Sequence, residues 1–283
     1  MKKLFIALAS IVALLGVLVL SLPTILHKAG LHPEYHGATV ELPGKRALVI
    51  TTSHGVLAAP GETEGEPSGV AISELTHPYY TFLDGGMRVD VASVKGGEIP
   101  VDPQTLMFMI ITPEDERFLS DPLLQAKVKN SLRIDDVDFT EYDIIFLAGG
   151  WGAAYDLGYS PVLAEKISEA YYAQKTPVMG GVCHGVLGLI NARDRDEKLL
   201  IAGRRMTGVS DKQIKELGIE ITPQHPETEL RKAGALYEKQ TAFRDQFATH
   251  VVVDDEQRFV TGQNQNSGLE TSHRMMQVLA ERE

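Results

Sequence analysis

The segment TPVMGGVCHGVLGLI, residues 176–190, decides how this chain is organised. It predicts a short buried strand over 178–182, a glycine-rich turn, and helical apolar spacing through Val186, Leu187 and Ile190. A sharp turn from a strand into a helix pushes one side chain out at the carboxyl edge of a sheet, and Cys183, the only cysteine, occupies that turn. Because a helix N-terminus favours a thiolate, we expect an exposed, ionised thiol rather than a buried structural cysteine.

Strand-like and helix-like segments alternate along the chain from Lys45 onward. β-branched, apolar runs predict strands, and amphipathic spacing predicts the helices between them. The strands are expected at 46–53, 88–94, 142–150, 178–182, 249–255 and 258–263, and the helices at 68–86, 122–132, 160–175 and 267–281. This alternation predicts an α/β domain over 44–283, with a mostly parallel sheet that is covered by helices on both faces.

Chemistry-bearing residues follow three of the predicted strands. Ligands of such sheets bind at the carboxyl ends of the strands, where Ser53–His54, Gly149–Gly152 and Cys183–His184 fall. His184 is the candidate base for the Cys183 thiol, and the backbone N–H groups of Gly150 and Trp151 are candidate oxyanion donors. His54 is a candidate for substrate binding. Glu74 lies on a helix face with apolar residues, but its spacing alone indicates a solvated side chain.

The first 26 residues predict a membrane anchor. Lys2 and Lys3 precede an uncharged apolar run over 4–26, which is long enough to span a bilayer. No small-residue cleavage site precedes His27, which favours an uncleaved, single-pass anchor over a cleaved signal peptide. The lysines are expected to stay in the cytoplasm, so the domain would lie on the periplasmic or extracellular side of the cytoplasmic (inner) membrane. Residues 27–43 are expected to form a linker.

Composition excludes other classes of function. The net charge of −11 and pI near 5.3 argue against nucleic acid as a partner. The histidines are scattered and none lies in an H-E-x-x-H motif, so no metal site is expected. No glycine-rich nucleotide motif follows the first strand, so nucleotide binding is unsupported as well.

Several motifs together resemble the ThiJ/PfpI superfamily, which is related to class I glutamine amidotransferases, and in particular its chaperone and glyoxalase III-like branch. The resemblance spans residues 46–281 and rests on the blocks TSH, SGVAISELTHPYYTF, VDVASVKGGEIPVDP, LAGGWGAAYDL, GGVCHG, RRMTGVSD, HVVVDD and VTGQNQNS, in the family's order. It implies a flavodoxin-like three-layer sandwich, usually a homodimer, with a Cys183–His184 pair at the elbow. It also implies that Glu74 contacts the sulfur.

Members of this branch are similar in converting methylglyoxal to lactate without glutathione. The resemblance therefore implies that Cys183 attacks the aldehyde of a small carbonyl substrate and that Glu74 or His184 moves a proton between the two carbons. The backbone N–H groups of Gly150 and His184 would hold the oxyanion. No metal or organic cofactor is implied.

Three positions depart from the family pattern. Trp151 stands where a histidine or a small residue is usual, and Val186 replaces a proline. Ile214 stands in register with the acid that orients the histidine; Asp211 is nearby and is the candidate substitute. A histidine without such an acid can lose on the order of 10⁴-fold in rate.

Three other functions remain open on the sequence. A holding chaperone needs exposed apolar patches, and a sequence alone cannot show whether these are present. A thiol redox or stress sensor needs an exposed, low-pKa cysteine and no triad acid, and Ile214 fits that requirement. A cysteine hydrolase or peptidase of another substrate needs the same nucleophile, and a peptidase needs an extended groove as well.

Overall fold

The computed structural model describes residues 2–282, and its domain is built on a seven-stranded sheet in the order β10-β11-β7-β6-β1-β4-β5. Neighbouring strands pair in parallel except β10 and β11, which are antiparallel. The strands are β1 (Arg46–Thr51), β4 (Arg88–Ser93), β5 (Leu132–Arg133), β6 (Ile144–Leu147), β7 (Val178–Val182), β10 (Val251–Val253) and β11 (Phe259–Gly262). The predicted mostly parallel sheet is confirmed.

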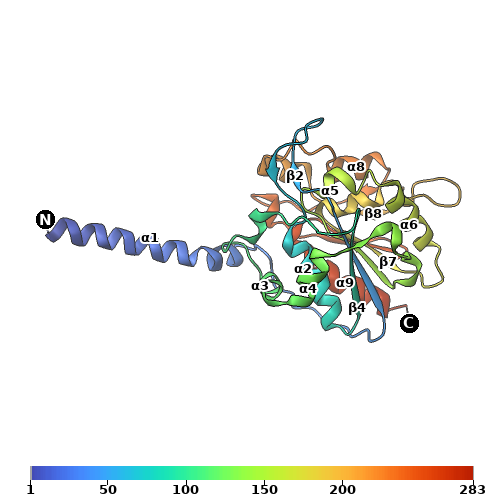
Figure 1. Ribbon diagram of the computed structural model, residues 1–283, viewed down its shortest axis with the longest axis horizontal. Helices are drawn as coiled ribbons and strands as arrows, with labels where there is room; N and C mark the ends of the chain where they lie inside the picture. Colours follow the sequence, from blue (N-terminus) through green and yellow to red (C-terminus); the bar gives the residue numbers. More distant parts are fainter. Residues whose placement is uncertain (1, 283) are drawn as a thin grey trace.

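Helices cover both faces of this sheet (Figure 1). Along β6, Ile144 and Phe146 face one apolar cluster while Ile145 and Leu147 face the other, because successive side chains of a strand point to opposite sides. The first cluster includes residues of α2 (Ile72–Asp84), α3 (Pro113–Ser120), α4 (Pro122–Lys129), α7 (Asp211–Leu217) and α9 (Gly268–Ala280), and the second those of α5 (Ala153–Asp156), α6 (Pro161–Tyr171) and α8 (Pro226–Lys232). The predicted three-layer, flavodoxin-like sandwich is confirmed.

Short elements connect these layers, and the sequence pattern did not predict them. Two small ribbons pair β2 (Val56–Leu57) with β3 (Glu66–Pro67) and β8 (Arg205–Met206) with β9 (Leu236–Tyr237). Short 3₁₀ helices cover Pro103–Leu106, Ile134–Asp136, Phe139–Glu141, Asp245–Phe247 and Gln265–Ser267. Elements of two to four residues are too short to show a hydrophobic period, so periodicity cannot detect them.

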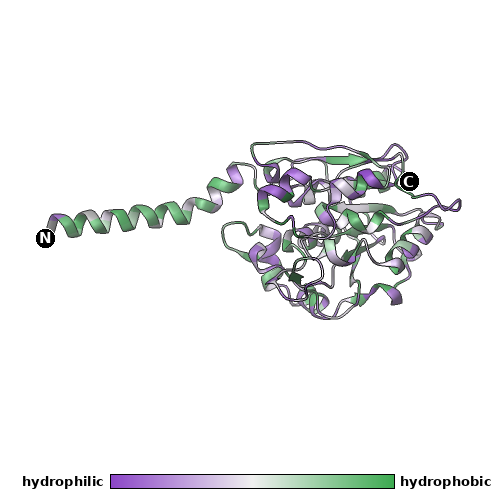
Figure 2. Ribbon diagram, turned by 90° about the horizontal axis from the view of Figure 1, so that it is seen from above, coloured by the Kyte–Doolittle hydropathy of each residue, from purple (hydrophilic) through white to green (hydrophobic). Residues whose placement is uncertain are grey.

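The N-terminal helix α1 (Lys2–Lys28) extends away from the domain and is apolar along most of its length (Figures 1 and 2). It is long and apolar enough to cross a membrane. Its described side chains up to Leu20 are exposed, and from Ser21 onward several are partly covered. The helix ends two residues beyond the predicted boundary at residue 26.

The segment after α1, predicted as a linker over 27–43, is attached to the domain. Leu31 and Leu42 are each only 4% exposed. The side chain of Asn266 donates to the carbonyl of Gly30 at 2.7 Å and accepts the backbone N–H of His32 at 2.8 Å. A free linker would not bury leucines or hold such contacts, so this segment is part of the folded domain.

Candidate active site

Cys183 occupies a strained turn directly after β7. Its φ is +56°, in the left-handed region that residues other than glycine rarely adopt. This is the geometry of a nucleophile elbow, as the sequence predicted. The residues that follow, Cys183–Leu189, form a 3₁₀ helix rather than the expected α-helix. Gly185 and Gly188 lower the α-helical propensity of this segment, which accounts for the difference.

The Cys183 thiol is buried, so the expectation of an exposed, ionised thiol is wrong. The residue is 2% exposed and lines a cavity of about 220 Å³. Burial, together with the nearby negative charge of Glu74, raises the pKa of the thiol well above its ordinary value. Backbone N–H groups of His184 and Gly150 point at the sulfur and act in the opposite direction. These two donors will stabilise the thiolate once the proton leaves.

Glu74 faces the sulfur from the first turn of α2. Its side chain is 1% exposed, accepts the backbone N–H of Gly149 at 2.9 Å through Oε2, and is hydrogen-bonded to Cys183. Burial raises the pKa of the carboxyl to about 8, against the opposing effect of these hydrogen bonds. Glu74 is therefore mostly protonated at neutral pH. The resemblance, and not the helical spacing, pointed to this residue.

Two glycines leave room for this arrangement. A Cβ on Gly149 would fall 2.4 Å from Oε2 of Glu74 and 2.8 Å from the backbone nitrogen of His184. Gly150 has a φ of +95°, and a Cβ there would fall 2.3 Å from the backbone nitrogen of Ala71. The predicted glycine-rich turn thus lets α2 and the elbow approach the end of β6 closely.

His184 lies behind the sulfur and is completely buried. Its Nδ1 is 3.4 Å from the sulfur of Cys183, while its Nε2 has no hydrogen-bond partner among residues 2–282. Trp151 presents an edge-to-face contact to the imidazole at 5.7 Å between ring centroids. Burial, with a smaller effect of His225, lowers the pKa of His184 to about 3. The ring is therefore neutral at physiological pH.

Asp211 does not take the place of a triad acid. Its carboxylate accepts the hydroxyl of Thr228 at 2.9 Å, and its side chain is exposed at the start of α7. Within the described part of the chain, no hydrogen bond or ion pair joins Asp211 to His184. Ile214 is 1% exposed and belongs to the apolar core. Asp211 therefore does not replace the missing acid beside His184, as the sequence suggested, because its carboxylate points to α8 instead.

His54 also lies apart from the site. Its Nε2 is 2.6 Å from the carbonyl oxygen of Val56, and its ring stacks on Tyr155 at 4.2 Å. The residues that line the Cys183 cavity do not include it. The expectation that His54 binds substrate is corrected, because these local contacts hold the ring in the β2 turn. Gly150 and Trp151, by contrast, do line the cavity.

Sequence reasoning missed the far wall of the cavity. It is built by residues distant from the elbow in the chain: Leu26, Leu31, His32, Met107, Ile110 and Leu217. Leu31, an apolar residue in an otherwise polar segment, was the one local signal of packing. Nothing in the pattern indicated which part of the domain it would contact.

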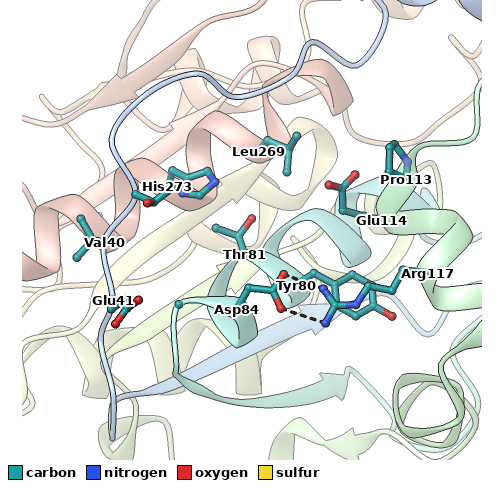
Figure 3. A pocket seen from close by; sticks show the side chains of 12 residues that line it. Val40, Glu41, Tyr80, Thr81, Asp84, Pro113, Glu114, Arg117, Leu269 and His273 are labelled. Atoms are coloured by element: carbon teal, nitrogen blue, oxygen red, sulfur yellow. Dashed lines mark hydrogen bonds and ion pairs between the residues drawn. The ribbon is translucent and has the colours of Figure 1, made fainter.

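A second cavity, of about 410 Å³, lies between α2, α3, α9 and the segment after α1 (Figure 3). Two of its charged groups pair with each other: Arg117 donates to Asp84 at 2.7 and 3.0 Å, and its guanidinium also stacks on Tyr80. It is lined by no cysteine. Among the described residues there is also no cluster of three or more His, Cys, Asp or Glu that would hold a metal ion. The Cys183 cavity is therefore the candidate active site.

The fold and the elbow define an α/β protein of flavodoxin-like topology with a cysteine directly after strand β7. The chain belongs to the DJ-1/PfpI family, whose model matches residues 67–277. This confirms the family that the sequence motifs predicted.

Three similar proteins place the chain within that family. It is 27% identical over 221 residues to Glyoxalase 3 of Candida albicans, covering 74% of this chain and 89% of that protein. It is 27% identical over 248 residues to Glutathione-independent glyoxalase HSP31 of Saccharomyces cerevisiae, covering 84% and 98%. The solved structure of Rapid Encystment Protein 24 KDa of Francisella tularensis is 33% identical, with a TM-score of 0.75 and coverage of 83% and 99%.

Proposed function

We propose that this protein is a glutathione-independent glyoxalase that converts 2-oxoaldehydes such as methylglyoxal to 2-hydroxy acids, which for methylglyoxal is lactate. The observation that carries the proposal is the hydrogen bond between the buried side chains of Glu74 and Cys183 at the wall of one cavity. A thiol and a carboxyl with a raised pKa are the two groups that this isomerisation requires. The names of the curated relatives support the same reaction.

In the first step the Cys183 sulfur attacks the aldehyde carbon. The thiol proton passes to Nδ1 of His184, which lies 3.4 Å away, and then to the aldehyde oxygen, giving a hemithioacetal. The N–H groups of Gly150 and His184, which face the sulfur, are close to the oxygen that becomes charged.

In the second step the ionised form of Glu74 removes the proton from the former aldehyde carbon. The electron pair forms a carbon–carbon double bond as the ketone oxygen takes up a proton. The proton held by Glu74 then returns to the neighbouring carbon while the hydroxyl of the first carbon loses its proton. The first carbon is oxidised to a thioester and the second is reduced to an alcohol, so no external oxidant or reductant is used. Water hydrolyses the thioester and restores the thiol. A pKa near 8 makes Glu74 a stronger base than an ordinary carboxylate.

The absence of a carboxylate that orients His184 affects only the role of that histidine. For Nδ1 to accept the thiol proton, the single N–H proton of the neutral ring must be on Nε2. No group within residues 2–282 accepts a hydrogen bond from Nε2. Desolvation keeps the ring neutral, so it can accept the proton, but its tautomer is not fixed. We therefore expect the attack step to be slower than in a complete triad.

Two other functions fit the site less well. A thiol sensor requires an accessible, low-pKa cysteine, whereas Cys183 is 2% exposed and its pKa is raised. A peptidase requires an extended groove, and a cavity of about 220 Å³ does not accommodate a polypeptide.

We also propose that α1 attaches the enzyme to the cytoplasmic membrane, supported by the length and composition of the helix. Lys2 and Lys3 support the orientation in which the domain lies outside the cytoplasm. The homodimer implied by the family stays a prediction.

Lactate formation from methylglyoxal, measured without glutathione on the full chain, tests the proposal. We expect turnover in the wild type and its loss in Cys183→Ser and Glu74→Gln. Asp211→Asn is the matched control and is expected to stay within about twofold of wild type, because its carboxylate contacts Thr228. Absence of turnover in the wild type, or full turnover in Cys183→Ser, would overturn the proposed function.

A further inference from the structure

The Cys183 cavity has two chemically different ends. The reactive groups, Cys183, Glu74 and the N–H of Gly150, lie at one end. The apolar wall is contributed by Leu26, Leu31, Met107, Ile110 and Leu217. Two of the polar residues that line the cavity are engaged elsewhere: Asp102 accepts from Ser68 and Gln104, and Thr105 accepts the N–H of Ile72. A ligand of this cavity would place a dicarbonyl at the sulfur and an apolar chain against the leucines.

The apolar end of the cavity lies where α1 leaves the domain. Leu26, in the last turn of α1, is one of its lining residues. The apolar run over 4–26 is about 35 Å long at about 1.5 Å per residue, and the hydrocarbon core of a bilayer is about 30 Å thick. When α1 spans a membrane, Leu26 is therefore at the level of the lipid headgroups.

Exposed apolar side chains surround this end of the cavity. Met107, which lines it, is 44% exposed, and its neighbour Phe108 is 55% exposed; Ile25 of α1 is 48% exposed. Apolar side chains left exposed beside an anchoring helix are typical of a surface that enters the headgroup region. When α1 spans a membrane, the cavity and the membrane surface would therefore meet at the base of α1.

The wall that α1 brings to the cavity is fixed in place. Asn266 holds the backbone of Gly30 and His32, and Leu31 between them is 4% exposed. Burial keeps the imidazole of His32 neutral by lowering its pKa to about 3. Apart from the His32 ring, whose Nδ1 has no hydrogen-bond partner among the described residues, this wall presents an uncharged, apolar surface.

We propose that this cavity takes 2-oxoaldehydes that carry an apolar chain and reside in the membrane interface. The inference rests on the proposed function and specifies its substrate class. The chemistry is the isomerisation and hydrolysis described above. The alkyl chain of the substrate takes no part in it and only adds contacts to Leu26, Leu31 and Met107. The product, a 2-hydroxy acid, is charged and returns to water.

Trp151 provides a test that does not depend on activity. It is the only tryptophan of the chain and lines the cavity, so its fluorescence reports on this place alone. The full chain is reconstituted in phosphatidylcholine vesicles that carry a spin label either at the headgroup or at the end of the acyl chain. We expect the headgroup label to quench the fluorescence and the deep label not to quench it. Equal emission in unlabelled and headgroup-labelled vesicles would overturn the membrane-facing cavity.

Kinetics on a homologous series test the substrate class. The wild-type full chain in vesicles is given methylglyoxal and straight-chain alkylglyoxals of increasing length. We expect kcat/KM to rise about fourfold for each methylene that the wall buries, until the cavity is full. Leu31→Ala is expected to lower the ratio of long-chain to methylglyoxal kcat/KM about tenfold. Leu42→Ala, from the same segment, equally buried but outside the cavity, is expected to leave the ratio unchanged.

The outcomes separate this inference from the proposed function. Turnover of methylglyoxal with no gain for longer chains overturns the inference and leaves the glyoxalase in place. A ratio that falls as much in Leu42→Ala as in Leu31→Ala also overturns it, because the loss would then be general. No turnover of any 2-oxoaldehyde overturns the proposed function itself.

Discussion

The carboxyl group of Glu74 and the thiol of Cys183 are hydrogen-bonded to each other in a place where burial raises the pKa of both. At neutral pH both protons therefore stay in the cavity. Catalysis requires that one group loses its proton, and Glu74 does so first, because its pKa is about 8.

The rate should consequently rise with pH. We expect kcat/KM for methylglyoxal to increase between about pH 7 and pH 9, as the Glu74 carboxyl, with its pKa of about 8, ionises and becomes the base. His184 stays neutral over this range because its pKa is about 3, so its titration does not change the rate between pH 7 and pH 9. The measurement is a pH–rate profile of the wild type at substrate concentrations below KM. A flat profile between pH 7 and pH 9 contradicts the role of Glu74 as the base.

The same carboxyl should make the stability depend on pH. Between the ordinary Glu pKa of 4.5 and about 8, Glu74 is protonated in the folded state and ionised in the unfolded state. The folded state binds more protons, so its free energy of unfolding falls as pH rises through this window, by about 1 kcal/mol per unit at most.

Glu74→Gln removes this titration. Urea unfolding at pH 5 and pH 8 should show a smaller loss of stability with pH in the variant than in the wild type. The same slope in both proteins would show that other groups cause the dependence.

Gly149→Ala should disrupt the site by steric conflict alone. The new Cβ would fall 2.4 Å from Glu74 Oε2 and 2.8 Å from the His184 nitrogen, and the latter cannot move away because it is backbone. We expect a loss of about 3 kcal/mol in the free energy of unfolding and loss of turnover.

The control for this substitution is Gly61→Ala. Gly61 has a φ of +89° and no atom within 4 Å of a new Cβ, so only backbone strain of about 1 kcal/mol is expected, with turnover retained. Stability is measured by denaturant unfolding. Equal losses in the two variants would show that a Cβ at Gly149 does not conflict with Glu74 and the elbow.

Asn266→Ala should release the segment after α1. It removes the contacts to Gly30 and His32, each worth about 1 kcal/mol. Amide hydrogen exchange in this segment should accelerate about tenfold or more, while the central strands stay protected. Gln277→Ala, which removes the contact to Tyr35 further along the same segment, is the control. It should leave exchange at His32 unchanged, and equal acceleration in both variants would mean that the segment detaches as a whole.

The sheet and the elbow could be predicted from the sequence because they depend on local patterns. Apolar β-branched runs specify the strands, and their carboxyl ends must meet at one edge of a parallel sheet, which brings Gly150 and Trp151 to Cys183. Glu74 could be assigned only by resemblance, because a helical pattern does not show which face a carboxylate occupies.

The errors have physical causes as well. The burial of Cys183 depends on how α2 and the segment after α1 pack over the elbow, and these contacts are distant in sequence. His54 was predicted near the site because it follows a strand, and Asp211 because it is close to Ile214 in the sequence. Local partners determine where these side chains point: Val56 and Tyr155 for His54, and Thr228 for Asp211.

The attachment of Gly30 and His32 to Asn266 also sets an order of events during synthesis. The ribosome makes α1 and the adjoining segment well before Asn266, which follows Gly30 by 236 residues. Until then Leu31 has no final position and the cavity lacks one wall. A nascent chain that has not yet reached residue 266 would carry Cys183 in a depression that lacks this wall. The synthesis of Asn266 is thus the event that lets the wall close over the reactive group.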